Sequence, residues 1–392
     1  MAGRFAPRPP TTRTTMRGGE VPVPQPRTES RPPLGEPAQD PDAIPGHDLD
    51  LDLDLGIDPG RDAAPAADRP APDADRVDAA MGREAAPDSA PQPAPDLAAL
   101  TDLDLGLTLG PLRRGPADPT FRVTPDGSVW RASRTPAGAG TLRVRIRGGA
   151  VRAEAWGPGG RWLLDGLPAL LGAEDDPTAF VPRHKLLAVT HRARRGLRLT
   201  RTGLVMESLI PSILEQKVTT HEAYGAWRVL VRKYGEPAPG PAPEGMYVMP
   251  DARTWAMIPS WEWHRANVDG KRSATIVRAA RVAHRMEEAA RMPPAEARKR
   301  LELIPGIGPW TSAETIQRSN GAPDEVTTGD LHLPGIVGWA LAGDRTADDA
   351  AMLELLAPYE GQRHRAARLI LLSGRVPPRR APRLAPNDIT GL

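Results

Sequence analysis

The pattern of hydrophobic and polar positions divides the chain into regions with different periodicities. Residues 111–172 contain short runs in which apolar and polar residues alternate, which is typical of strands. Residues 175–378 contain apolar residues three and four positions apart, which is typical of amphipathic helices. Residues 1–108 show neither pattern over a long stretch. The sequence therefore predicts an α+β protein in which a small antiparallel β domain precedes an all-α domain.

Two β-hairpin turns are predicted in the first folded region. Residues 141–147 (TLRVRIR) alternate between apolar and basic, Gly148 and Gly149 follow, and residues 151–155 alternate again. Two alternating runs that are separated by two glycines indicate a hairpin. A second turn is expected at residues 125–127 (PDG), between two further apolar segments. Because arginines fill one side of the first run, the domain is expected to have one basic face.

Helices are predicted from apolar stripes in the second region. The first runs from Leu209 to Lys233, and Pro211 either kinks it or marks a later start. Thr346 and Asp349 resemble a capping box that opens a helix. The helix that Thr346 caps is expected to run through Leu356, and further helical segments are expected over residues 276–286, 293–303 and 362–372.

The charge is distributed unevenly along the chain. Residues 1–110 hold 10 lysines and arginines against 20 aspartates and glutamates, whereas residues 111–392 hold 41 against 29. An acidic N-terminal segment is thus joined to a basic body. A basic body indicates a polyanionic partner, and nucleic acid is the first candidate. An arginine-rich solvated surface without such a partner is the alternative interpretation.

The N-terminal segment, residues 1–108, is expected to be disordered. It holds 19 of the 46 prolines and few large apolar residues that could offset the entropy lost on ordering. An Asp-Leu repeat at residues 48–55, echoed at 102–105, is either a docking peptide for a protein partner or low-complexity drift. Residues 379–392 are expected to form a C-terminal tail.

Several function classes are excluded by composition. The chain contains no cysteine, which excludes disulfides, thiolate zinc sites and iron–sulfur clusters. The eight histidines show no metal-like pairing, so no cofactor is expected. No apolar run reaches the ~18 residues of a membrane span, and the N-terminus lacks the apolar core of a secretory signal. A cytoplasmic location is therefore expected, at the nucleoid if the source is bacterial.

The clearest chemical signal is residues 303–313 (LIPGIGPWTSA). One helix is expected to end before Gly306 and Gly308, and another begins at about Pro309. Glycine permits positive φ and close backbone approach, and the first N–H groups of a helix bind phosphate. The pattern predicts a helix-hairpin-helix element that grips the DNA backbone without reading its sequence.

Other interpretations of this segment fit less well. An ordinary tight turn between two helices is the main alternative. A dinucleotide-binding loop is disfavoured, because Thr311 stands at the third glycine position and no strand precedes the segment.

Downstream of the hairpin, Asp330 follows Trp310 by twenty residues. With this aspartate the sequence resembles the helix-hairpin-helix DNA glycosylase superfamily, and more closely its 3-methyladenine DNA glycosylase II group. The resemblance covers roughly residues 175–375, and the β domain ahead of it also fits that group. Three further segments are similar to motifs of the group: residues 213–219 (ILEQKVT), 271–276 (KRSATI) and 358–363 (PYEGQR).

The resemblance implies a monofunctional DNA-3-methyladenine glycosylase-like enzyme that initiates base excision repair on double-stranded DNA. An alkylated base would be flipped out of the duplex, and Asp330 would stabilise positive charge on the sugar while the N-glycosidic bond is hydrolysed. A helix N-cap before Leu331 is the alternative role of Asp330. Lyase-competent members carry a Schiff-base lysine where this chain has Trp310, so no lyase activity is expected.

Further site residues follow from the same resemblance. The residues expected to contact DNA are Gly306, Ile307, Gly308, Thr311, Gln216 and Lys217. The residues expected to line the base pocket are Trp310, Glu314, Trp261 and Trp263, with structural packing as the alternative for the tryptophans. The superfamily also implies a monovalent cation held by backbone carbonyls of the hairpin.

Two departures from the group leave the substrate open. Glu314 stands where the group has an aromatic residue, and Lys217 stands where it usually has glutamine or leucine. These residues keep open a glycosylase for a deaminated or oxidised base. A helix-hairpin-helix protein that binds DNA without catalysis is a further alternative, which Asp330 and Trp310 disfavour.

Overall fold

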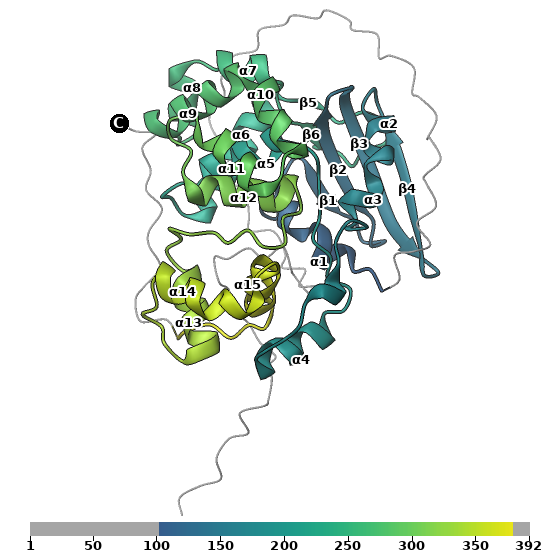
Figure 1. The fold of residues 1–392 in the computed structure, drawn as a ribbon. Helices are drawn as coiled ribbons and strands as arrows, with labels where there is room; N and C mark the ends of the chain where they lie inside the picture. Colours follow the sequence, from purple (N-terminus) through teal and green to yellow (C-terminus); the bar gives the residue numbers. More distant parts are fainter. Residues whose placement is uncertain (1–101, 379–392) are drawn as a thin grey trace, which may run out of the picture. The chain divides into compact units, whose positions relative to one another are not determined.

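The computed structural model describes residues 102–378, which form an antiparallel β-sheet followed along the chain by a larger set of helices (Figure 1). This arrangement confirms the predicted α+β class. The predictions for the Asp-Leu repeat at residues 48–55 and for the tail at 379–392 lie outside the described residues. The same holds for the expected disorder of the N-terminal segment up to residue 101.

The sheet contains four strands in sequential order: β1 (Phe121–Val123), β2 (Val129–Thr135), β3 (Gly138–Arg147) and β4 (Ala150–Trp156). Each neighbouring pair is antiparallel, and both predicted turns connect adjacent strands. At the turn between β3 and β4, Gly148 and Gly149 have φ values of +59° and +75°. Two positive φ values match the right-handed twist of the flanking strands, so the Gly-Gly signal is confirmed with its structural reason.

One side of the sheet packs against three short helices, α1 (Leu105–Leu109), α2 (Gly160–Asp165) and α3 (Leu167–Leu170). Strand residues such as Leu142 share a buried core with leucines of these helices. The expected basic face is partly neutralised, because Arg143 donates to the carboxylate of Asp126 at 2.7 Å.

Helix α1 corrects the expected boundary of the N-terminal segment. The prediction of disorder is wrong for residues 102–108, which belong to the folded protein. Asp104 caps α1 by accepting a hydrogen bond from the backbone N–H of Leu107 at 2.9 Å. Leu103 and Leu105 are buried under the sheet, whereas Leu107 enters a second core among the C-terminal helices. The echo of the repeat at 102–105 is therefore a core segment.

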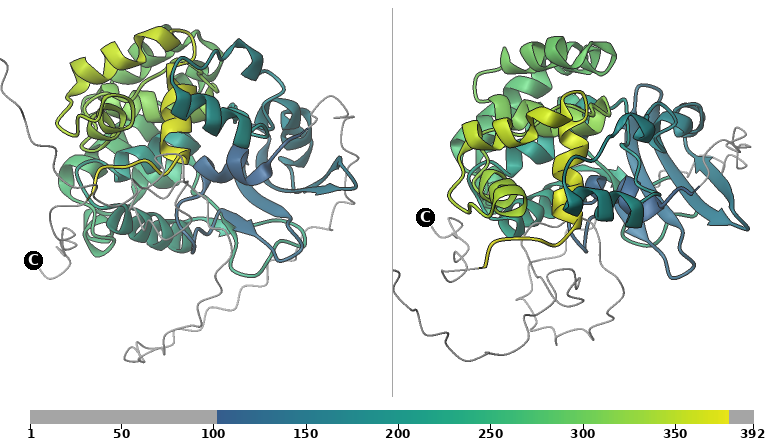
Figure 2. Two further views of the ribbon diagram at one scale, coloured as in Figure 1. Left: turned by 90° about the horizontal axis from the view of Figure 1, so that it is seen from below. Right: turned by 60° about the horizontal axis from the view of Figure 1, so that its bottom comes forward.

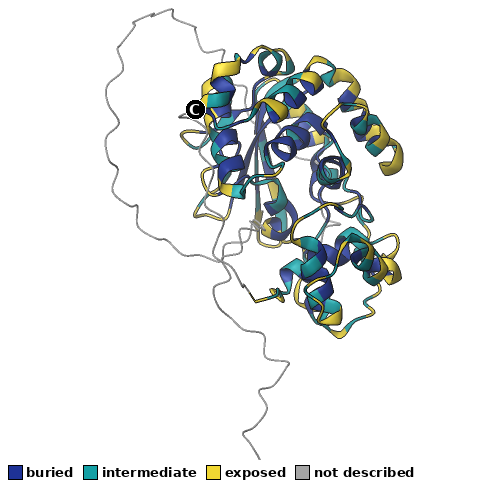
Figure 3. Cartoon of the chain, turned by 90° about the vertical axis from the view of Figure 1, so that its left-hand side faces the viewer, coloured by how far each residue is buried: buried dark blue, intermediate teal, exposed yellow. Residues whose placement is uncertain are grey.

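The remaining helices form two groups with separate cores. Figure 2 gives two further views of these helices, and Figure 3 colours them by burial. The first group comprises α5 (Val205–Leu214), α6 (Thr220–Tyr234), α7 (Ala252–Met257), α8 (Ser260–Arg265), α9 (Gly270–Arg281), α10 (Ala283–Glu287), α11 (Pro294–Glu302) and α12 (Pro309–Ser319). The second comprises α4 (Lys185–Ala193), α13 (Leu333–Ala342), α14 (Asp349–Leu356) and α15 (Arg363–Leu372). A two-stranded ribbon, β5 (Glu236–Pro237) with β6 (Tyr247–Val248), follows α6.

The long helix predicted from Leu209 to Lys233 is wrong, because two helices, α5 and α6, occupy this stretch. Between them Lys217 adopts a left-handed φ of +56°. Thr219 then caps α6, since its hydroxyl accepts from the backbone N–H of Glu222 while the Glu222 carboxylate accepts from the backbone N–H of Thr219. This reciprocal capping box was the sequence signal for the true start of the helix.

Other helix ends differ less from their predictions. The capping box predicted from Thr346 and Asp349 is wrong, because Asp348 caps α14 by accepting from the backbone N–H of Ala351 at 2.9 Å. The predicted stripe over residues 276–286 is divided between α9 and α10. Helices α11 and α15 begin and end within about one residue of their expected bounds. Within residues 102–378, no helix is both long and apolar enough to cross a membrane.

The placement of α1 gives a first testable prediction. Leu109 is only 1% exposed and packs in the core beneath the sheet. Leu109→Ala is expected to lower the free energy of unfolding by about 2–5 kcal/mol, because it removes buried methyl groups and leaves a cavity. Chemical denaturation of the full chain measures this change. Val181→Ala, at a position that is 53% exposed, serves as the control, and equal stability of the two variants would contradict the assignment of α1 to the fold.

Candidate DNA-binding and active site

The predicted hairpin lies between α11 and α12. Gly306 has a φ of +102°, and a Cβ atom there would lie 2.1 Å from the hydroxyl of Thr275 on α9. The backbone N–H of Ile307 donates to the carbonyl of Ile304 at 2.9 Å and closes the turn. Only glycine therefore fits at position 306, both for its conformation and for its space.

The hairpin is braced from two neighbouring helices. The side-chain amide of Gln216, just after α5, donates to the Gly306 carbonyl at 3.0 Å and to the Thr311 hydroxyl at 2.7 Å. Arg278 on α9 donates to the Pro305 carbonyl at 2.9 Å. These contacts hold the turn in one conformation before any ligand binds.

The predicted DNA-contacting residues have different exposures. Ile307 is 5% exposed and Thr311 is 2% exposed, so both side chains are core groups and only their backbone is available to a ligand. Gln216 is half-buried, and its amide N–H groups are already bonded to the hairpin. Lys217 is exposed beside them. Because α12 starts at Pro309, the backbone N–H groups of its first turn have no partners within the helix and suit a phosphate.

Asp330 lies on the segment between α12 and α13. Its Oδ1 atom accepts from the backbone N–H groups of His332 and Leu333, each at 2.8 Å. Its Oδ2 atom accepts from the indole Nε1–H of Trp310 at 2.9 Å. The alternative role of Asp330 as a helix N-cap before Leu331 is wrong, because α13 begins at Leu333 and its N-cap residue is His332. Asp330 connects the start of α12 with the start of α13.

The segment that carries Asp330 is fixed along its length, first by α12. Gln317 on α12 donates through its amide to the Glu325 carbonyl and to the Thr327 hydroxyl, each at 2.9 Å. The Thr327 hydroxyl in turn donates to Glu314 at 2.7 Å. Gln317 is only 7% exposed, so these bonds are buried.

Other helices hold the two ends of the same segment. Arg363, at the start of α15, donates to Asp324 through its backbone N–H and its guanidinium. Burial raises the pKa of Asp324, but the bonds from Arg363 outweigh it and hold the pKa below its usual range. At the other end, the Gly329 N–H donates to Asp349 of α14 at 2.8 Å. Three helices therefore fix the position of Asp330.

The structure separates the four residues expected in the base pocket. Trp310 and Glu314 lie one turn apart on α12, on the side of the Asp330 segment. Trp263 is 3% exposed and stacks on Trp255 in the core of the first helical group, so the prediction that it contacts a base is corrected. Trp261 is 62% exposed on the same short helix, α8, which belongs to the first helical group.

Sequence reasoning missed a group of buried basic residues beside Glu314. Arg318 donates to the Glu314 carboxylate at 2.7 Å. Arg368 on α15 is 8% exposed, and burial together with the nearby Arg318 lowers its pKa to about 10. Loss of solvation, with Arg368 as the largest charge effect, holds the pKa of His364 well below its usual range. No pattern in the sequence singled these residues out, because His364 and Arg368 share α15 with Arg363 and Arg365.

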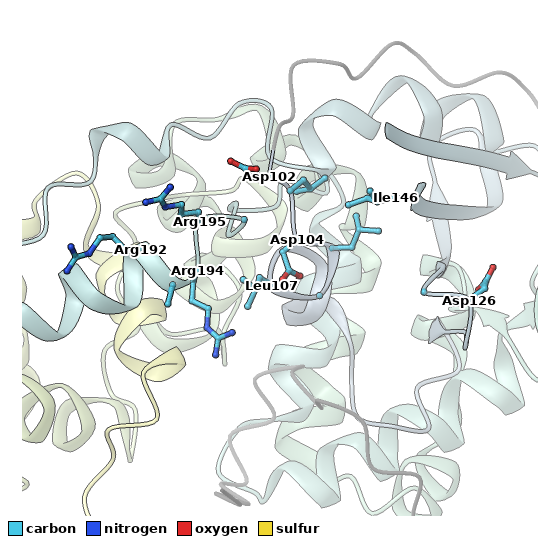
Figure 4. A pocket seen from close by; sticks show the side chains of 14 residues that line it. Asp102, Asp104, Leu107, Asp126, Ile146, Arg192, Arg194 and Arg195 are labelled. Carbon is cyan, nitrogen blue, oxygen red and sulfur yellow. Dashed lines mark hydrogen bonds between the residues drawn. The ribbon is translucent and has the colours of Figure 1, made fainter. Parts of the chain in front are cut away.

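Asp330 lines neither of two hollows that lie in the described part of the chain. The larger, of about 760 Å³, is an open hollow lined by α1, the loops of the sheet and the end of α4 (Figure 4). Arg192, Arg194 and Arg195 line one side of it. The smaller, of about 10 Å³, lies beside Arg318 and has room for about one water molecule.

Residues 102–378 contain no group of three or more histidines and carboxylates that could hold a metal ion.

Comparisons with known proteins define the fold. No family model matches the sequence, and no curated protein matches it. A solved structure of MBOgg1 with a low-affinity DNA ligand is 18% identical with a TM-score of 0.57, covering 70% of this chain and 93% of that one. An 8-oxoguanine glycosylase/lyase from Clostridium acetobutylicum is 11% identical with a TM-score of 0.55, covering 70% and 92%. A 3-methyladenine DNA glycosylase from Archaeoglobus fulgidus is 17% identical with a TM-score of 0.56, covering 70% and 96%.

These likenesses extend over nearly the whole length of each solved protein. At identities of 11–18% they establish the fold and leave the reaction to be argued from the site. The chain therefore has the helix-hairpin-helix DNA glycosylase fold, as expected from its resemblance.

The hairpin geometry leads to a second prediction. Gly306→Ala is expected to destabilise the protein by more than about 1 kcal/mol, because alanine disfavours a φ of +102° and its Cβ would overlap Thr275. Thermal unfolding measures the effect. Gly308→Ala is the matched control, since its φ is −111° and a Cβ there meets nothing within 4 Å. Equal unfolding temperatures for the two variants would contradict the assigned hairpin geometry.

Proposed function

We propose that this chain is a monofunctional DNA glycosylase that hydrolyses the N-glycosidic bond of a damaged base, with alkylated bases as the first class to test. The observation that carries the proposal is the placement of Asp330. Its carboxylate is tied to the first turn of α12 through Trp310, directly after a hairpin whose shape suits a DNA backbone.

The hairpin would bind the phosphates beside the damaged nucleotide. The first N–H groups of α12 and the helix dipole favour an anion there. The exposed Lys217, adjacent to the residue that braces the hairpin, would add a cation at the same surface. These contacts are independent of sequence, which suits an enzyme that must find a lesion in any context.

Asp330 would act on the flipped nucleotide. As the N-glycosidic bond breaks, positive charge develops on the sugar, and a fixed carboxylate beside it stabilises that charge. Water then adds its oxygen to C1′ and loses a proton. An alkylated base, which is a cation in the nucleotide, leaves as a neutral molecule and the proton passes to solvent, whereas an uncharged base takes up that proton. Because the Oδ1 atom accepts from the backbone N–H groups of His332 and Leu333 and the Oδ2 atom accepts from Trp310, the carboxylate is held in place before the substrate arrives.

Trp310 also supports the absence of a lyase step. A β-elimination lyase needs an amine that forms a Schiff base with C1′. The side chain nearest Asp330 on α12 is an indole, whose N–H is engaged with the carboxylate. The reaction would therefore stop at the abasic site.

Two further proposals concern ligands other than DNA. A monovalent cation is proposed to bind backbone carbonyls of the hairpin, of which those of Pro305 and Gly306 also accept hydrogen bonds from Arg278 and Gln216. The acidic N-terminal segment is proposed to bind a protein partner, and its Asp-Leu repeat lies outside the described residues.

The role of Asp330 gives a third prediction. Asp330→Asn is expected to reduce base release by at least about 100-fold, because the amide carries no charge to stabilise the sugar. Its remaining oxygen can still accept from the backbone N–H groups of His332 and Leu333, so the fold is retained. Base release from a randomly methylated duplex and from a panel of other lesions measures the effect. Asp344→Asn, at an exposed turn aspartate, is the control. If the wild type binds DNA but releases no base, the proposed glycosylase activity is contradicted and only the DNA-binding role remains.

A fourth prediction tests the monofunctional reaction. The wild type is expected to leave abasic strands intact until alkali is added, and to form no covalent adduct with DNA under borohydride, because no amine stands at position 310. Denaturing gels with and without alkali separate the two products. Strand cleavage that persists with homogeneous protein would show lyase activity and contradict this part of the proposal.

A further inference from the structure

The larger hollow, between α1, the end of α4 and the loops of the sheet, has one side that carries positive charge. Its volume is about 760 Å³, and Arg192, Arg194 and Arg195 line that side (Figure 4). All three side chains are exposed, and none of them forms an ion pair within residues 102–378. Because three like charges lie within four consecutive residues, this side of the hollow favours an anion.

The aspartates that line the same hollow leave the charge of these arginines in place. Asp104 caps α1 through its Oδ1 atom. Asp126 lies across the hollow from the arginines in Figure 4, and it is paired with Arg143 at 2.7 Å. Asp102 is the third aspartate, and it forms no ion pair with any described arginine. The three arginines therefore have no carboxylate partner in the described part of the chain.

The side of the hollow that faces the arginines carries an exposed apolar residue. Ile146, near the end of β3, lines the hollow and is 41% exposed (Figure 4). Burial of this isoleucine under another apolar side chain would be favourable, because it removes apolar surface from water. A ligand that fits the hollow thus combines anionic groups on one side with aliphatic groups on the other.

The chain itself contains a segment with this division. Residues 49–55 (LDLDLDL) alternate between leucine and aspartate. In an extended segment alternate side chains point to opposite sides, so all of the aspartates can face one wall and all of the leucines the other. The echo of the repeat shows this division in the folded protein. Leu103 and Leu105 are each 8% exposed, whereas Asp102 and Asp104 are exposed.

The repeat can reach the hollow within one molecule. The described chain begins at Asp102, which itself lines the hollow. Residues 56–101 connect the repeat to this point, and a chain of that length can span up to roughly 150 Å. Because both partners belong to one chain, a contact that is too weak to form between separate molecules can still form here.

We propose that residues 49–55 dock in this hollow, with their aspartates on the three arginines and their leucines against Ile146. A DNA backbone would also pair with the arginines, but it has no aliphatic side chains to cover the isoleucine. The docked segment screens the arginines from DNA phosphates and is withheld from the protein partner proposed for the acidic segment. This inference is independent of the proposed glycosylase function.

The test uses the absence of cysteine from the chain. Full-length protein with Leu53→Cys and Ala193→Cys carries one cysteine in the repeat and one at an exposed position that lines the hollow. Mild oxidation at low protein concentration is expected to join them at least about tenfold faster than in the control, because docking raises their effective concentration. The control pairs Leu53→Cys with Ala295→Cys, at an exposed alanine of α11 that does not line the hollow.

Charge reversal tests the pairing in the same cysteine variant. Arg194→Glu together with Arg195→Glu is expected to slow the cross-link to the rate of the control, because two attractions become repulsions. Both arginines are exposed, so these changes leave the core intact. Adding Asp50→Arg and Asp52→Arg restores opposite charges and is expected to recover the fast rate.

Four outcomes would overturn the inference. One is an equal rate for the two cysteine pairs, and another is a fast rate that survives charge reversal. A cross-link between two molecules, seen as a doubled mass on a denaturing gel, would make a second copy the occupant. The last is a loss of salt dependence in DNA binding by Arg194→Gln with Arg195→Gln, of about 0.9 in slope for each lost phosphate contact, without a fast cross-link. That result would assign the hollow to DNA.

Discussion

The hydrogen bonds to Asp330 are the interaction on which the candidate site depends. A carboxylate on a connecting segment normally samples several rotamers, but three N–H groups from the start of α13 and from Trp310 fix this one. The hydrogen bonds also join the two helical groups, because Trp310 opens α12 and Leu333 opens α13. Each charge-assisted bond of this kind is worth about 1.5–3 kcal/mol. The same geometry that starts a helix therefore positions the carboxylate for chemistry.

The surrounding structure makes that position rigid. The segment before Asp330 has almost no apolar anchor of its own, and its place is set by polar contacts to Gln317, Arg363 and Asp349. Such contacts are short in range and directional, so a small shift of any one helix would move the carboxylate. The hairpin is braced in a similar way by Gln216 and Arg278. Both halves of the site are thus held by polar side chains on neighbouring helices, of which Arg278 is exposed and the others are buried or half-buried.

The sequence predicted the parts of this protein that depend on local pattern. The hairpins of the sheet, the Gly306–Gly308 element and the bounds of α11 and α15 follow from turn residues and helical spacing. The sequence-based prediction was wrong where contacts between distant parts of the chain determine the structure. Leu103 to Leu109 have the composition of the acidic segment, but two cores bury their leucines. Trp263 has the residue type of a base-stacking group, but Trp255 and the first helical core enclose it. The interruption between α5 and α6 at Lys217 could have been predicted from Thr219 and Glu222, which form the capping box of α6.

The cluster of Arg318 and Arg368 could not be predicted from the sequence, because it brings together three segments that are distant along the chain. Arg368 comes from α15 and Arg318 from α12, and both donate to backbone carbonyls of the stretch that begins with α1, at Leu107 and Pro111. The end of the acidic N-terminal segment thus packs against both helices. No local pattern along the chain records these contacts, because each arginine meets a partner more than 200 residues away in sequence. Only the folded arrangement of the three segments therefore shows where the two guanidinium groups lie.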